Sequence, residues 1–176
     1  MIKYFDHDEV IKAKKQKKTV LAIFFAVAAV YLASVVVFLV MVYNMPYGDD
    51  PTVPKLVEYS VTGVFAIFSF VYLGIPLRRV NKYFKLTVNL DTGIKEESVA
   101  SFLEYDETIH DKDGVDCKAL VFLEWNKYKK DYFERKVLVF YEKEFPVIAE
   151  QAEVKFVTQG NFFIEYEIIE DGENAE

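Results

Sequence analysis

The stretch TVLAIFFAVAAVYLASVVVFLVMVY, Thr19–Tyr43, decides the fold class, because it is uncharged and almost wholly apolar. At a rise of 1.5 Å per residue, a helix over this stretch reaches about 37 Å, against about 30 Å of bilayer hydrocarbon. A second uncharged run, Tyr59–Leu77, is long enough to cross a bilayer with little excess. The proline- and glycine-containing segment between the runs predicts a short polar turn. The sequence therefore predicts a hairpin of two transmembrane helices.

Lysine and arginine are unevenly distributed around these runs. Six lysines precede the first run, Arg78 and Arg79 follow the second, and the connecting segment offers only Lys55. The positive-inside rule then predicts a multi-pass protein of the cell membrane with both termini in the cytoplasm. A cleaved signal peptide is disfavoured, because its apolar region usually spans about 7–15 residues. The predicted segments are a basic N-terminal segment (1–18), two transmembrane helices (19–43 and 56–77), an external loop (44–55) and a cytoplasmic β domain (78–176).

Two features near the spans allow more than one interpretation. The N-terminal segment, Met1–Lys18, is interpreted as an interfacial turn whose lysines hold anionic headgroups, with docking on a partner or on the chain's own soluble domain as the alternative. Small residues at four-residue spacing along the first span either form a helix interface or reflect the ordinary abundance of alanine in membrane helices. These residues are Ala22, Ala26, Ala29 and Ala33.

Short alternating and β-branched runs follow the second span. Leu86–Leu90 alternates apolar and polar residues, which predicts a half-buried strand, and Asp91–Gly93 predicts a turn onto a strand ending near Tyr105. Further strands are predicted over Cys117–Trp125, Tyr132–Glu142, Val154–Thr158 and Phe162–Ile169. Five or six strands with short turns and no long helix favour a small closed barrel, OB-like or similar, with a β-sandwich as the alternative.

A short membrane hairpin followed by a small cytoplasmic barrel resembles the layout of NfeD-like membrane proteins, whose soluble part is an OB barrel. The resemblance covers the order of the elements and carries over no functional residue. It implies a scaffold or partner of other membrane proteins.

Charge is segregated along the 176 residues. Residues 1–79 hold nine Lys or Arg against six Asp or Glu, a net +3, whereas residues 80–176 hold twelve against twenty-two, a net −10. A domain this acidic is a poor general nucleic-acid binder, because that affinity comes from neutralised phosphates. The single cysteine, Cys117, excludes a disulfide scaffold and is predicted to pack inside the domain.

The densest polar cluster of the sequence lies beside Cys117 and holds residue types that ligate metals. Its weak candidate ligands are His110, Asp111, Asp113 and Asp116. The spacing does not match an EF-hand loop, and a second Cys or a further nearby His for zinc is missing. Asp113-Gly114 is an ordinary hairpin dipeptide, so a solvent-exposed turn is the favoured interpretation and a weak cation site the alternative.

Lysines alternate with aromatic residues over Trp125–Phe133. The candidate interaction residues are Trp125, Lys127, Tyr128 and Lys130. An exposed hairpin tip is the favoured interpretation. Contact with the membrane, with a protein partner or with a single nucleic-acid strand are the alternatives.

Motifs of nucleotide binding or nucleophilic catalysis are missing from the sequence, and two histidines leave little material for acid–base chemistry. We therefore expect no catalytic residue and no cofactor. The predicted function is a non-catalytic, membrane-anchored interaction or scaffold module, as a homo-oligomer or an accessory subunit of a larger assembly. Its expected partners are the lipid bilayer and another membrane protein or a second copy, without nucleic acid. A ligand- or cation-sensing module is the alternative and an enzyme the third hypothesis. Lysine-rich, arginine-poor usage indicates a bacterial source.

Overall fold

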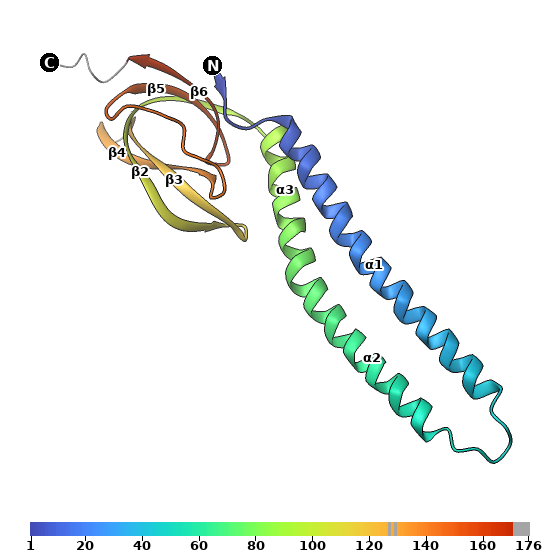
Figure 1. Cartoon of the computed structure of the whole chain (residues 1–176). Helices are drawn as coiled ribbons and strands as arrows, with labels where there is room; N and C mark the ends of the chain where they lie inside the picture. The colour runs from blue at the N-terminus through green and yellow to red at the C-terminus, as the bar shows by residue number, and fades with distance from the viewer. Residues whose placement is uncertain (127, 129, 171–176) are drawn as a thin grey trace. The chain divides into compact units, whose positions relative to one another are not determined.

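The computed structural model of the chain describes residues 1–126, 128 and 130–170 (Figure 1). Its elements, in chain order, are β1 (Ile2–Lys3), α1 (His7–Tyr43), α2 (Thr52–Tyr72), the π-helical η1 (Leu73–Leu77), α3 (Arg78–Thr92), β2 (Glu96–Lys112), β3 (Val115–Asn126), β4 (Asp131–Phe140), β5 (Glu153–Gln159) and β6 (Phe162–Glu170). Contacts divide the chain into two units. The helical unit is Lys14–Asn81, and the barrel unit joins Met1–Ala13 to the chain from Lys82 onward.

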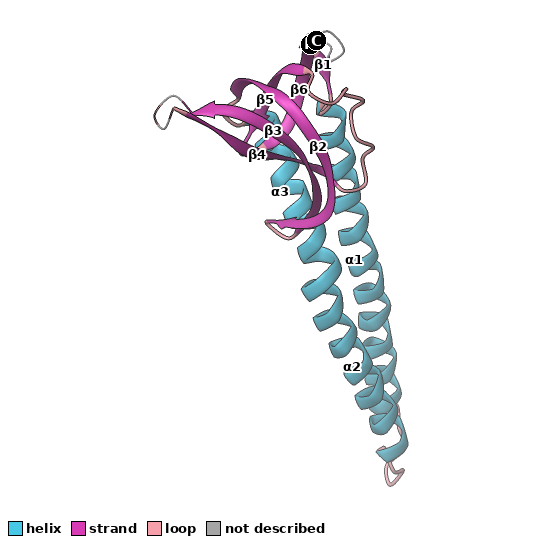
Figure 2. Cartoon of the chain, turned by 90° about the vertical axis from the view of Figure 1, so that its left-hand side faces the viewer, coloured by secondary structure: helices cyan, strands magenta, loops and turns pink. Residues whose placement is uncertain are grey.

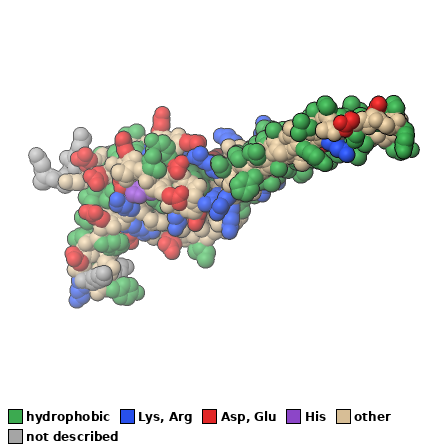
Figure 3. Space-filling model, turned by 90° about the horizontal axis from the view of Figure 1, so that it is seen from below, with side chains coloured by type: hydrophobic (Ala, Val, Ile, Leu, Met, Phe, Trp, Pro, Cys, Tyr) green, Lys and Arg blue, Asp and Glu red, His purple; other side chains and the backbone are tan. Residues whose placement is uncertain are grey.

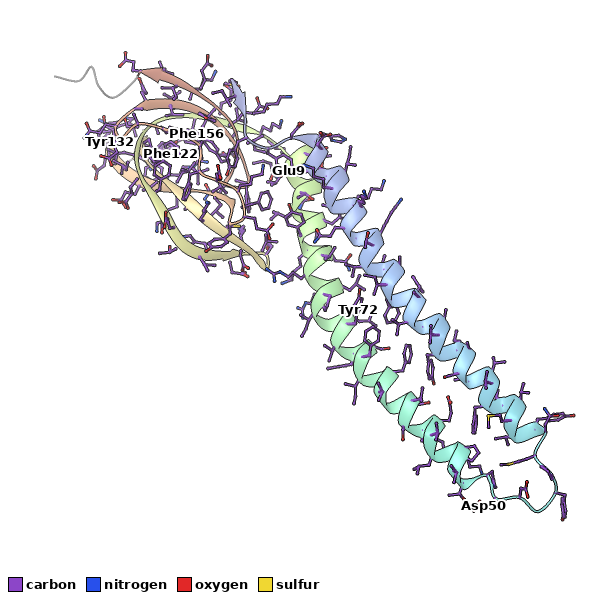
Figure 4. The ribbon with its side chains drawn as sticks, in the orientation of Figure 1. Glu9, Asp50, Tyr72, Phe122, Tyr132 and Phe156 are labelled. Carbon is purple, nitrogen blue, oxygen red and sulfur yellow. The ribbon has the colours of Figure 1, made fainter. Side chains whose placement is uncertain are left out.

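In the helical unit, α1 and α2 pack through one aromatic face each. Tyr31 stacks on Phe65 with ring centroids 4.1 Å apart, and its hydroxyl lies 3.2 Å from Thr62 Oγ1. Nearer to η1, the Tyr72 hydroxyl points at α1 and donates to the Val20 carbonyl at 3.0 Å (Figure 4). Partly buried side chains recur along α1 at alternating spacings of three and four, the pattern of an antiparallel coiled-coil seam. They are Leu21, Phe24, Ala28, Tyr31, Val35 and Phe38.

The remaining surface of the helical unit is apolar and exposed. No residue of α2 is buried, and α1 buries only Ala13, which belongs to the barrel unit. Hydrophobic side chains cover the face of this unit seen in Figure 3. The alanines at positions 22, 26, 29 and 33 are all exposed, so this stripe does not seal the hairpin. Both helices are long and apolar enough to cross a membrane, by length and composition.

Both helices extend beyond the spans predicted within them. The first helix begins at His7, before the predicted span at 19–43, and the second begins at Thr52, inside the predicted loop over 44–55. Pro54 accounts for the second difference, because proline is tolerated in the first turn of a helix, where its missing N–H has no partner to lose. The helical backbone also continues through Pro76 by widening to π-helical geometry at Leu73–Leu77.

The barrel unit contains a closed five-stranded barrel (Figure 2). Strands pair in the order β6-β4-β3-β2-β5, and β5 pairs with β6 to close the ring. All pairings are antiparallel except β4 with β6, which meet in parallel at Leu138 and Phe162. The predicted small closed barrel is confirmed, and the β-sandwich alternative is wrong.

The predicted strand over Leu86–Leu90 is wrong, because these residues lie in α3. Leu86 and Leu90 are four residues apart, a spacing that places both on one helix face as readily as on one strand face. Thr87 is also fully buried, which fits a helix face and not an alternating strand. The predicted turn at Asp91–Gly93 is instead the end of this helix, where the Gly93 N–H donates to the Asn89 carbonyl at 2.8 Å. The expectation that the domain has no long helix fails with it.

The barrel interior is aromatic. Phe122 stacks on Phe156 with centroids 4.4 Å apart, and Phe102 and Phe163 contact the same ring (Figure 4). A second apolar cluster lies on the outer side of β3, β4 and β6, where α3 and the N-terminal segment cover it. It comprises Phe5, Leu86, Leu90, Cys117, Phe140, Phe162 and Ile164.

The N-terminal segment is therefore part of the barrel unit. Ile2 and Lys3 pair with β6, and the Tyr4 and Phe5 N–H groups donate to the Ile164 carbonyl. Glu9 forms an ion pair with Lys143. For Met1–Ala13 the structure shows docking on the chain's own domain, which is one of the two alternatives, and contact of the lysines with headgroups stays a prediction.

Candidate functional site

The end of the β3–β4 hairpin presents exposed aromatic side chains. Trp125 and Tyr132 face each other across the two strands, with ring centroids 4.8 Å apart in an edge-to-face arrangement. Tyr128 is wholly exposed. Asn126 shapes the tip, because its side-chain oxygen accepts from the Tyr128 N–H at 2.9 Å and its carbonyl accepts from the Lys130 N–H at 2.8 Å.

Of the predicted interaction residues, the structure brings Trp125, Tyr128 and Lys130 together at this hairpin end. Lys127 lies outside the described residues. Phe133, on the other side of β4, adds a further partly exposed ring that sequence reasoning did not single out as an interaction residue.

The acidic cluster forms the turn between β2 and β3. Asp113 and Gly114 both have positive φ, 56° and 77°, as a two-residue type I′ turn requires. The Gly114 N–H donates to Asp111 Oδ1 at 3.1 Å, and Asp116 lies opposite Asp111 in the strand register. His110 turns away to bond Asp106. Within residues 1–126, 128 and 130–170, no three His, Cys, Asp or Glu side chains gather as a metal-binding group. The cation site stays a prediction without geometric support.

A polar network on the outside of the barrel surrounds Asp106. Its Oδ2 accepts from Lys136 Nζ at 2.7 Å and lies 3.0 Å from His110 Nε2, and its Oδ1 accepts from the Thr108 N–H at 3.0 Å. The hydrogen bond from the Lys136 ammonium makes the largest contribution to holding the pKa of Asp106 well below its usual range. Thr108 and His110 contribute less. The same contact raises the pKa of Lys136. The network binds β2 to β4 and leaves His110 engaged by a carboxylate.

Arg135 is a polar residue that the sequence reasoning missed. It pairs in register with the buried Phe122, so its side chain faces the barrel interior near one end. Its guanidinium donates to Ser98 Oγ at 2.9 Å, to Glu124 Oε2 at 2.9 Å and to Thr158 Oγ1 at 3.1 Å. These acceptors come from β2, β3 and β5, so one side chain ties four strands together. The signal was present in the sequence, because Arg135 is in phase with the inward-facing Val137 and Val139.

Cys117 packs inside the second apolar cluster, as predicted. Burial, aided by Asp111 and Asp116, raises the pKa of its thiol to about 11. A thiol in this state is a poor nucleophile at neutral pH. The clusters around Asp106 and Arg135 join carboxylates to cations, an arrangement that stabilises folded structure.

No family model, curated protein or solved structure matches the chain. Any assignment of function therefore rests on the chemistry of the chain itself.

Proposed function

We propose that the protein is a non-catalytic, membrane-anchored interaction module. In this proposal α1 and the continuous run of α2 and η1 cross the cell membrane, both termini lie in the cytoplasm, and the barrel engages another membrane protein or a second copy. The observation that carries the proposal is the exposed apolar surface of the helical unit. Side chains such as Phe25, Val30 and Phe70 are 65%, 72% and 84% exposed, which water does not favour and lipid does.

The architecture of the barrel supports a binding role. Five strands in a closed Greek-key ring, with one parallel contact between β4 and β6, are what an OB-like barrel requires. Folds of this size host many unrelated binding functions, so the fold itself does not name the partner. The layout is also the basis for the proposed relationship to NfeD-like scaffolds.

Charge narrows the class of protein partner. Residues 80–176 carry a net −10, so complementary surfaces on a partner are basic. The polar clusters of the barrel are internally paired, which leaves surface recognition rather than chemistry as its proposed role.

Two measurements test this function. A reporter fused after residue 176 is expected to be active in the cytoplasm, and an external reporter signal would contradict the orientation. Cross-linking in native membranes followed by affinity purification is expected to recover a higher assembly. A monomer that co-purifies with nothing, or a chain freely soluble without detergent, would overturn the proposal.

A further inference from the structure

The end of the β3–β4 hairpin combines exposure with the ring types that favour a membrane interface. Trp125, Tyr128 and Tyr132 are 47%, 100% and 60% exposed, and Phe133 is 41% exposed. Trp and Tyr rings place an apolar body and a polar edge where headgroups meet hydrocarbon, and they concentrate there in membrane proteins. Trp125 and Tyr132 share one face of the hairpin end, Tyr128 lies at its tip, and the barrel covers none of these three rings.

The charge of this segment is opposite to that of the rest of its domain. Residues 125–133 hold three lysines and one aspartate, a net +2, whereas the remainder of 80–176 holds nine bases against twenty-one acids, a net −12. An anionic leaflet attracts the first and repels the second, within about a Debye length of its surface. The difference in charge therefore favours contact of an anionic leaflet with this hairpin end over contact with the rest of the domain.

The connection to the helical unit keeps the domain close to a membrane that the helices cross. Only residues 14–18 separate Ala13, the last residue of the barrel unit's first segment, from the uncharged run that begins at Thr19. Even fully extended, five residues span about 18 Å at most. This length bounds the attachment of the barrel unit as a whole, which experiences a raised effective concentration of headgroups.

We propose that the end of the β3–β4 hairpin binds the anionic phospholipid headgroups of the membrane that anchors the chain. The rings of Trp125 and Tyr128 enter the interfacial layer, and Lys130 contacts lipid phosphate. This inference rests on the membrane anchoring proposed above and adds a second point of attachment for the barrel.

Trp125 is the only tryptophan in the chain, so its fluorescence reports on this site alone. The experiment uses the full chain in nanodiscs of phosphatidylcholine, with or without phosphatidylglycerol. In the discs with phosphatidylglycerol we expect Trp125 emission to shift to shorter wavelength, brominated lipids to quench it and acrylamide quenching to fall. K130Q is expected to lower the ratio of bound to free tip about fivefold, the factor one lysine supplies at an anionic surface. K112Q, which removes a lysine from the β2–β3 turn instead, is the matched control and is expected to behave like the wild type.

Other outcomes overturn the inference in distinguishable ways. If Trp125 stays equally open to acrylamide in both lipids while the chain remains in the disc, the headgroup contact is wrong and the anchoring stands. If shielding follows the number of chains per disc and not the lipid charge, the occupant is a second copy. If shielding appears only when membrane extract is added, the occupant is another protein. A chain that stays in solution without entering the discs contradicts the proposed function itself.

Discussion

The helical unit and the barrel unit place the same kinds of side chain in opposite positions. Phe122 in the barrel is fully buried, whereas Phe70 in α2 is 84% exposed. The polar contact between Tyr31 and Thr62 joins the two helices, whereas most charged groups of the barrel lie on its outside. This inverted arrangement is what the proposed solvation of the helical unit by lipid and of the barrel by water would produce.

The difference also changes what holds each unit together. Barrel strands associate because association buries their apolar inner faces away from water. The packing density of the interior therefore decides the stability of the barrel. Two helices in lipid gain nothing from burying apolar area against each other, and they depend on ring stacking, close approach and a few hydrogen bonds. Equivalent substitutions in the two units should therefore have unequal costs.

The largest expected difference comes from removing one phenylalanine from each unit. F122A empties the centre of the aromatic core and is expected to lower the free energy of unfolding of the barrel by about 3–5 kcal/mol. F70A removes a ring that faces outward and is expected to leave the barrel unchanged. Chemical denaturation of the full chain in nonionic detergent, followed by Trp125 fluorescence, measures both. Equal losses in the two variants would break the comparison.

The next effect concerns Arg135, the charged residue whose side chain faces the otherwise apolar barrel interior. R135M keeps the approximate length of the side chain but removes its donors to Ser98, Glu124 and Thr158, so we expect a loss of about 2–3 kcal/mol in the same assay. R135K restores the charge but not the branched set of donors and should recover only part of the loss. Full recovery by lysine would mean that charge alone, and not geometry, holds the strands.

A smaller effect is expected inside the hairpin. Ala28 lies on the same face of α1 as Phe24 and Tyr31, which stack on α2, whereas Ala26 is exposed. A28L should force the helices apart at a cost of about 1–2 kcal/mol, and A26L should cost almost nothing. Disulfide formation between cysteines introduced at positions 24 and 68 measures the separation: it is expected to slow in A28L only. Slowing in A26L would show that the assignment of the inner face is wrong.

The sequence predicted the long apolar helices and the hairpin turns. It failed where the same apolar spacing fits both the helical and the strand periodicity. Thr19–Tyr43 has no charge to place in water, and the hairpin turn at Asp113-Gly114 is chemically explicit, so these elements were found. Leu86 and Leu90 fit a strand and a helix equally well over five residues. Only the buried Thr87, known from tertiary contacts, separates the two. Docking of the N-terminal segment on the barrel was not the favoured interpretation, because its pairing with β6 joins residues far apart in the chain.

In the candidate site, too, local features were predicted and features that depend on strand pairing were not. Trp125 and Tyr128 were found because aromatic residues between lysines at a hairpin tip are visible locally. The partners of His110 were not found, because Lys136 on β4 reaches Asp106 on β2 only after the strands have paired. Arg135 was not predicted, because the strand was identified from its apolar residues alone. An inward-facing arginine needs acceptors from other strands, and the sequence does not show which strands lie beside it.

The smallest test compares the outer network of the barrel with its interior through pH. Lys136, Thr108 and His110 favour the ionised form of Asp106 and lower its pKa in the folded state. The network therefore contributes stability above the ordinary carboxyl pKa of about 3.9, and this contribution is lost as the pH falls below that value. D106N cannot ionise, so the stability gap between wild type and D106N should be constant above about pH 5 and should narrow between pH 4 and the onset of acid unfolding. Denaturation midpoints across this range measure the gap.

The variant K136M, which removes the principal partner of Asp106, is the control. Its stability gap to the double variant D106N/K136M is expected to be smaller. Parallel curves for wild type and D106N down to pH 3 would mean that Asp106 titrates alike in the folded and unfolded chain, and that the outer network, unlike the aromatic core, contributes nothing to the barrel.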